Sequence, residues 1–228
     1  MLFNRYKNKK VSILGDSIST LEGYNPAGSS IYYDAMMAKD TYVEKYSDTW
    51  WGMLIEYLGA RLLINDSYSG STMAAAYNIL TYPAGCSLER IKNLGTEDEK
   101  PDLVIIFMGT NDYYNKIPIY NENIENLRFF DNSYRFAIEM INRYYNKPEI
   151  WILNIPSTIN IKDKNYTFPE SFDNTYLREY NKALLEIAKD YNLKYIDLYK
   201  TGSYETLDGV HPNKQGMVDI FEMIRAGI

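Results

Sequence analysis

The feature that most limits how this chain can fold is one uninterrupted apolar run, Leu103–Met108, with the sequence LVIIFM. A strand with one solvent-exposed face alternates apolar and polar side chains, whereas a strand covered on both faces does not. The run therefore predicts a central strand of a parallel sheet with helices on both sides. Shorter apolar runs predict four more strands, at Val11–Leu14, Arg61–Ile64, Ile150–Leu153 and Tyr195–Leu198.

Helical patterns separate these runs, and strands that alternate with helices are typical of an α/β fold. Two shorter helices are expected, one capped by Ser47 or Asp48 and ended by Gly59, and one opened by Ser71 or Thr72 and running through Ala76. Longer helices are expected at Asp131–Tyr145 and Thr175–Tyr191. A closing helix should have Pro212 in its first turn. No internal repeat, linker or low-complexity segment interrupts this order. We therefore expect residues 1–228 to form one domain.

Composition excludes several classes of function. The formal net charge of -6 argues against nucleic acid, which is bound through clustered Lys and Arg. No stretch reaches the roughly 18 consecutive apolar residues of a membrane span. The single cysteine, Cys86, excludes an internal disulfide, and one Cys with one His leaves too few ligands for a structural zinc site. A buried Cys86 is favoured over a reactive thiol.

The N-terminal segment carries no complete secretion signal. Its first residues are basic, but the apolar stretch that follows ends at Gly15 and lacks a small-residue cleavage site. Two alternatives stay open, a cytoplasmic protein or one whose leader has been removed, and we expect the first. No feature of the sequence predicts the oligomeric state.

Polar residues with catalytic potential follow three of the predicted strands. Ser17, in Gly-Asp-Ser, lies at a strand-to-helix junction, where its hydroxyl and its own N–H would face the carboxyl edge of the sheet. Asn111, in Gly-Thr-Asn-Asp, would offer its amide to a developing oxyanion. Gly70 lets a backbone N–H approach a ligand closely. Each residue has an ordinary alternative: a helix cap for Ser17, and turns for Asn111 and Gly70.

The only histidine, His211, lies three residues after Asp208 in the sequence Asp-Gly-Val-His-Pro. This spacing lets the Asp208 carboxylate reach one ring nitrogen and fix the tautomer, which leaves the other nitrogen free as a base. A serine hydrolase needs one imidazole, so His211 must be that base if Ser17 is the nucleophile. A lone surface histidine is the alternative when this motif is considered by itself.

Taken together, these motifs resemble the SGNH (GDSL-type) hydrolase family, whose four namesake residues correspond to Ser17, Gly70, Asn111 and His211. The resemblance extends from Val11 to Pro212, with Ile18 in place of the family's leucine, and Gly70 lies in the loosest block. It implies a flavodoxin-like three-layer α/β/α sandwich with a five-stranded parallel sheet in the order 2-1-3-4-5. It also implies ester hydrolysis through an acyl-enzyme, without a metal or organic cofactor. Ser17, Asp208 and His211 would be catalytic, and Ser17, Gly70 and Asn111 would form the oxyanion hole.

The substrate is predicted only as a class, a small-molecule ester with a short acyl group on a carbohydrate or another polar alcohol. The alternatives are a lysophospholipase or thioesterase and a non-catalytic carbohydrate-binding module of the same fold. Segments 22–46 and 154–172 lack a helical period and follow strand ends, so we expect them to border the cleft and to set substrate choice. The expected substrate-binding residues are Tyr24, Tyr32, Trp50 and Asp112. The 23 tyrosines have two explanations, a sugar-stacking surface or codon bias, and the second is favoured.

Overall fold

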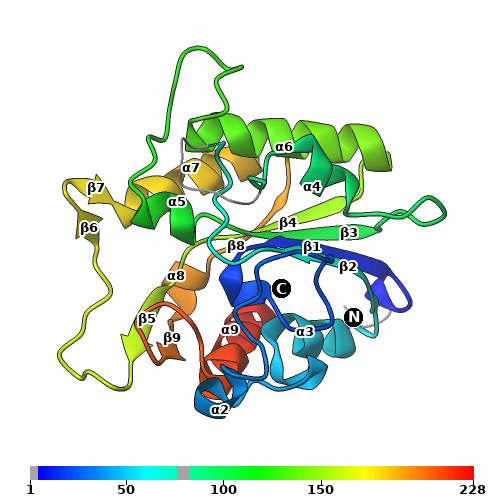
Figure 1. Cartoon of the computed structure of the whole chain (residues 1–228). Coiled ribbons are helices and arrows are strands. Elements are labelled where there is room, and N and C mark those ends of the chain that lie inside the picture. The colour runs from blue at the N-terminus through cyan, green and yellow to red at the C-terminus, as the bar shows by residue number, and fades with distance from the viewer. Residues whose placement is uncertain (1–4, 76–82) are drawn as a thin grey trace.

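Five parallel strands form the main sheet of the computed structural model, which describes residues 5–75 and 83–228. Their spatial order is β2 (Arg61–Ser67), β1 (Lys10–Gly15), β3 (Leu103–Phe107), β4 (Glu149–Leu153) and β8 (Lys194–Ile196). Numbered along the chain within this sheet, the order is 2-1-3-4-5. Helices lie on both faces (Figure 1), so the predicted α/β/α sandwich is confirmed.

Two helical layers bury the sheet. One face is covered by α4 (Leu88–Lys92), α6 (Phe130–Tyr145) and α7 (Leu177–Asp190), and the other by α3 (Trp50–Leu58) and α9 (Lys214–Gly227) (Figure 1). Along β3, Val104 and Ile106 enter the core under α6, whereas Ile105 enters the core under α3. Burial on both faces explains why the LVIIF sequence of this strand contains no polar residue. No helix in the described part of the chain is long and apolar enough to cross a membrane.

Short elements continue the chain beyond the strands. They are the 3-10 helices η1 (Ser17–Ser19) and η2 (Tyr46–Asp48), the helices α2 (Ala38–Thr41), α5 (Thr110–Tyr114) and α8 (Leu198–Thr201), the parallel pair β5 (Ser157–Asn160) and β9 (Ser203–Thr206), and the hairpin of β6 (Ser171–Phe172) and β7 (Thr175–Tyr176). Three of them, η1, α5 and α8, begin within a few residues of the ends of β1, β3 and β8. Of these, η1 carries Ser17 and α5 carries Asn111, both at the carboxyl edge of the sheet.

Helix α3 shows how capping residues set an element's limits. The Thr49 side chain accepts a hydrogen bond from the Gly52 N–H, and Gly59 ends the helix at a left-handed φ of 64°. The predicted end at Gly59 is confirmed. The cap is Thr49 rather than Ser47 or Asp48, because the latter two residues belong to η2.

The observed limits of two other elements differ from the predicted ones for a similar reason. The last strand of the main sheet ends at Ile196, since the Asp197 carboxylate accepts from the Lys200 N–H and caps α8. The closing helix begins after Asn213, whose side chain accepts from the Gly216 N–H, so Pro212 lies just outside the first turn. In both cases a polar side chain captures the N–H groups that begin a helix.

The helix predicted from Ser71 or Thr72 is wrong for residues 71–75, which are irregular with a bend at Met73 and Ala74; Ala76 lies outside the described residues. The buried Asp112 carboxylate accepts hydrogen bonds from the N–H groups of Met73 and Ala74. The N–H of Ala75 is bonded to the carbonyl of Leu127. These partners from distant parts of the chain hold this backbone in a non-helical form.

Candidate active site

The carboxyl ends of three strands bring three of the four motifs together. Gly15 at the end of β1 pairs with Ser67 of β2 and Phe107 of β3. Because the strands are parallel, the residues that follow them emerge at the same edge of the sheet. The segments that carry Ser17, Gly70 and Asn111 all begin there.

The fourth motif reaches this edge from the C-terminal part of the chain. The Nε2 atom of His211 lies 2.9 Å from the Oγ atom of Ser17, although 194 positions separate the two residues. On the other side of the ring, His211 Nδ1 lies 2.6 Å from Asp208 Oδ2. Ser17, His211 and Asp208 thus form a continuous hydrogen-bonded chain in the order that the sequence predicted.

The local backbone holds Asp208 against the imidazole. Its Oδ1 atom accepts the N–H groups of Val210 at 2.9 Å and His211 at 2.7 Å, which leaves Oδ2 for the ring. Gly209 between them has a φ of 92°, and an added Cβ would lie 2.5 Å from the Tyr166 ring. The carbonyl of Gly209 accepts hydrogen bonds from the hydroxyls of Thr158 and Tyr166. Segment 154–172 therefore holds the turn of Asp208 and His211 in place through these contacts with Gly209.

The electrostatics of Asp208 define the histidine tautomer. Burial would raise the pKa of this carboxyl, but the hydrogen bond and charge of His211, with the two backbone N–H groups, hold it well below its ordinary value. An ionised Asp208 can only accept, so Nδ1 of a neutral His211 carries the proton. The Nε2 atom is then an acceptor that faces the Ser17 hydroxyl.

Asn111 and Gly70 lie in segments that begin at the same edge of the sheet as the segment of Ser17. One hydrogen of the Asn111 amide is donated to the Ser71 carbonyl at 2.9 Å, and the second is available for an oxyanion. Gly70 is exposed and has a φ of 78°, a conformation that glycine adopts without strain. The Asn111–Ser71 bond connects the two segments directly. Their role in an oxyanion hole remains a prediction.

Of the four residues expected to bind substrate, two have no exposed surface to offer. Trp50 is fully buried and packs edge-on against Phe107, and Asp112 is fully buried beneath the segment that follows Gly70. Direct substrate contact is therefore wrong for both. Tyr24 is partly exposed, beside Tyr46 and near the free edge of β2. Tyr32 lies directly on the imidazole of His211.

Asp112 instead makes stability depend on pH. Burial raises its pKa to about 7, and the N–H groups of Ala74 and Met73 oppose this shift only in part. Burial likewise raises the pKa of Asp16 to about 6. The native state therefore retains protons that the unfolded state has lost, so native stability falls as the pH rises from about 4 towards 7.

We expect the free energy of unfolding of the protein, measured in urea, to decrease on the order of 4 kcal/mol between about pH 5 and pH 7.5 through these two groups. Asp112→Asn removes the charge, so its curve should be flatter over the same range. Parallel curves for the two proteins would show that ionisation of Asp112 costs nothing in the native state.

A buried arginine beneath the site was not predicted from the sequence. Arg90 of α4 is fully buried and paired with Asp66 of β2 at 2.7 Å. It also donates to the Ser71 hydroxyl and to the carbonyl of Gly15. One guanidinium thus links the ends of β1 and β2 to Ser71, whose carbonyl accepts the hydrogen bond from Asn111. No motif marks this residue, because its partners are distant in sequence.

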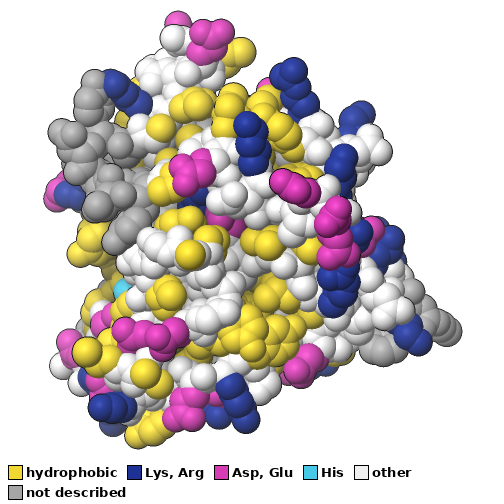
Figure 2. Space-filling view, turned by 45° about the vertical axis from the view of Figure 1, so that its right-hand side comes forward, with side chains coloured by type: hydrophobic (Ala, Val, Ile, Leu, Met, Phe, Trp, Pro, Cys, Tyr) yellow, Lys and Arg dark blue, Asp and Glu magenta, His cyan; other side chains and the backbone are white. Residues whose placement is uncertain are grey.

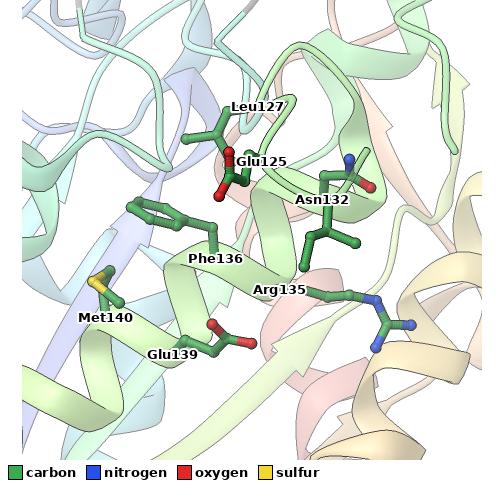
Figure 3. Close-up of a pocket in the computed structure, with 8 residues that line it drawn as sticks. Glu125, Leu127, Asn132, Arg135, Phe136, Glu139 and Met140 are labelled. Atoms are coloured by element: carbon green, nitrogen blue, oxygen red, sulfur yellow. The ribbon is translucent and has the colours of Figure 1, made fainter. Parts of the chain in front are cut away.

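One cavity lies away from these residues. It has a volume of about 600 Å³ and lies on α6 between Leu127, Phe136 and Met140 (Figure 3). None of the candidate catalytic residues lines it. In the space-filling view, basic and acidic side chains are interspersed and His211 is visible only as a small patch at the edge (Figure 2). Among the described residues drawn on that face, Lys and Arg form no continuous surface of the kind that binds nucleic acid.

Fold and site together define a class, an α/β/α protein with a Ser–His–Asp arrangement at the carboxyl edge of its sheet. The chain belongs to the GDSL-like lipase/acylhydrolase family, whose sequence profile matches residues 9–228. No curated protein matches it at a significant level.

Several solved structures share the fold. A candidate GDSL-like lipase from Bacteroides ovatus is 28% identical, with a TM-score of 0.75 over 96% of this chain and 97% of that one. A second, from Bacteroides uniformis, is also 28% identical, with a TM-score of 0.74 over 97% and 95%. A carbohydrate acetylesterase family member from Sinorhizobium meliloti is 18% identical, with a TM-score of 0.64 over 96% of each chain, and it shows likeness of fold alone.

Proposed function

We propose that this protein is a serine esterase that removes a short acyl group from a carbohydrate or another polar alcohol. One observation carries the proposal: the hydrogen-bonded chain from Ser17 Oγ through both nitrogens of His211 to Asp208. A serine hydroxyl is a weak nucleophile until a neighbouring base takes its proton. Here the base is present, its tautomer is fixed, and membership of an acylhydrolase family agrees with ester cleavage.

In the proposed reaction, Ser17 Oγ attacks the acyl carbon while its proton passes to His211 Nε2. The carbonyl oxygen becomes an oxyanion, which accepts hydrogen bonds from the Asn111 amide and from the N–H groups of Gly70 and Ser17. The intermediate collapses, and the proton on Nε2 goes to the departing alcohol oxygen. Water then attacks the acyl-enzyme with His211 again as base, which releases the carboxylic acid and restores Ser17. Asp208 stabilises the imidazolium in both halves of the reaction.

The surroundings of the triad favour a small, polar substrate. Ser17 is only 4% exposed, so the acyl carbon must enter a confined space. Thr158 and Tyr166, whose hydroxyls donate to the carbonyl of Gly209, make the neighbourhood of the histidine turn polar. A long acyl chain, in contrast, needs an apolar channel beside the serine. The cavity on α6 is lined by none of the catalytic candidates.

The test is hydrolysis of 4-nitrophenyl esters from acetyl to decanoyl, together with acetylated sugars, because two proteins with this fold are described as carbohydrate acetylesterases. We expect kcat/KM to be highest for acetyl esters and about tenfold or more lower for octanoyl esters. Ser17→Ala should abolish the activity, and EDTA should leave it unchanged.

Other outcomes of the same panel would point elsewhere. A maximum at long acyl chains, or a preference for thioesters, would favour the lysophospholipase or thioesterase alternative. Calorimetric binding of sugars without hydrolysis of any ester would identify a carbohydrate-binding module. Activity that EDTA removes and a divalent metal restores would contradict the serine mechanism.

A further inference from the structure

The ring of Tyr32 lies flat on the imidazole of His211. The two ring centroids are 3.6 Å apart, and the planes are inclined by 12°. The Tyr32 hydroxyl donates to Asp208 Oδ2 at 3.2 Å, the same oxygen that faces His211 Nδ1. Tyr32 therefore contacts two members of the proposed triad at once, one through its ring and one through its hydroxyl.

The chain on both sides of Tyr32 is fixed to the segments that carry the triad. Its backbone N–H donates to Thr20 Oγ1, and the Thr20 hydroxyl in turn donates to the carbonyl of Ser17. The next residue, Tyr33, is buried and donates its hydroxyl to the carbonyl of Pro212, directly after His211. Tyr32 is thus anchored at the serine side and at the histidine side of the site.

These contacts allow Tyr32 to influence both the orientation and the charge of the His211 imidazole. The Asp208 side chain is 43% exposed and that of His211 is 19% exposed, so the protein encloses this pair incompletely. The phenol covers one face of the imidazole and restricts its rotation away from Ser17. Burial and the neighbouring Asp208 charge raise the pKa of Tyr32, which keeps its hydroxyl a donor. When His211 takes the proton, the resulting cation lies over an aromatic face, an arrangement that stabilises positive charge.

We propose that Tyr32 is a positioning residue: its ring holds the His211 imidazole in line with Ser17 and stabilises the imidazolium that forms during proton transfer. This inference rests on the proposed esterase function. It replaces the expectation that Tyr32 contacts substrate. The ring provides the main effect, and the hydroxyl adds a smaller one through Asp208.

The experiment compares Tyr32→Phe, Tyr32→Leu and Tyr32→Met in the hydrolysis of 4-nitrophenyl acetate. Leucine and methionine fill the space without an aromatic face, so we expect each to lower kcat about tenfold with KM within about twofold of the parent value. Phenylalanine keeps the stacked ring, so its kcat should stay within about threefold. Tyr57→Leu is the matched control, because this half-exposed tyrosine on α3 contacts only Phe221 among aromatic rings of the described residues and should leave kcat unchanged.

Proton NMR supplies a second readout, independent of turnover. The chain has one histidine, so the ring C–H resonances belong to His211 without further assignment. Stacking should displace these resonances upfield in the parent protein and in Tyr32→Phe, and the displacement should disappear in Tyr32→Leu and Tyr32→Met. If one of the two aliphatic variants does not fold, the other still decides the comparison.

The result separates this inference from the proposed function. Equal rates for the parent protein and Ser17→Ala would mean that the esterase function has failed, and the role of Tyr32 with it. A parent that depends on Ser17, with native kcat in both aliphatic variants, would overturn the Tyr32 inference alone. A loss confined to KM would also overturn it, since that result assigns Tyr32 to substrate binding.

Discussion

Ser17→Ala and His211→Ala are each expected to lower kcat for acetyl ester hydrolysis by about 10⁴-fold or more, and the double variant should lose at most a few-fold beyond either one. The reason is that the two groups act as a unit. Without Nε2 the hydroxyl keeps its proton, and without the hydroxyl the base has no nucleophile to activate. Because the chain contains no second histidine, no other imidazole can replace His211.

The measurement is a single-turnover and steady-state comparison of the four proteins, each purified to remove host esterases. Ser19→Ala is the matched control. It lies on the same turn as Ser17, and its buried hydroxyl has no hydrogen-bond partner within the described residues, so its removal should leave kcat near the parent value. Near-native turnover by Ser17→Ala, or multiplication of the two losses in the double variant, would contradict the assigned mechanism.

The catalytic candidates could be predicted from sequence because each lies in a short local motif. Continuous apolar runs predict the strands, and parallel strands bring their carboxyl ends to one edge of a sheet. The sequence therefore predicts Ser17 and Asn111 at the same edge of the sheet. Asp208 and His211 lie in one turn, so their contact depends only on local spacing.

The failures concern interactions between distant segments. Residues 71–75 have the composition of a helix start, but the Asp112 carboxylate captures two of their N–H groups. The sequence shows Tyr32 as an aromatic residue in an irregular loop, yet nothing local indicates that it stacks on a residue near the other end of the chain. Periodicity describes one element at a time, so it cannot report such contacts.

The tyrosines illustrate the same limit. Several are core residues whose hydroxyl reaches a main-chain carbonyl: Tyr134 bonds to Met108 and Tyr204 bonds to Val210, each at 2.8 Å. A buried tyrosine needs such a partner for its hydroxyl. The sequence records the abundance of these residues, whereas the acceptor that permits burial is defined only by the fold.

Arg90 is the clearest case, because a charged residue in a short helix is normally expected at the surface. Its guanidinium is fully buried and makes hydrogen bonds to Asp66, Ser71 and Gly15. Burial pulls the pKa of Asp66 upward, and the charge and hydrogen bond of Arg90 counteract that shift. The pair therefore joins α4 to the ends of two strands directly beneath the candidate oxyanion hole.

Arg90→Met should lower the free energy of unfolding by about 3–5 kcal/mol, because it leaves the Asp66 carboxylate buried without its partner. The matched control is Arg61→Met, which breaks an exposed ion pair with Glu99 and should cost less than about 1 kcal/mol. Both values come from urea unfolding at one pH. Adding Asp66→Leu to Arg90→Met removes the unpaired charge, so the double variant should recover part of the loss. Equal, small effects of Arg90→Met and Arg61→Met would show that the buried pair does not hold these segments together.

Because Ser71 accepts a bond from Asn111 as well as one from Arg90, a folded Arg90→Met protein should also have a lower kcat. That coupling would connect the stability of the sheet edge to the stabilisation of the oxyanion.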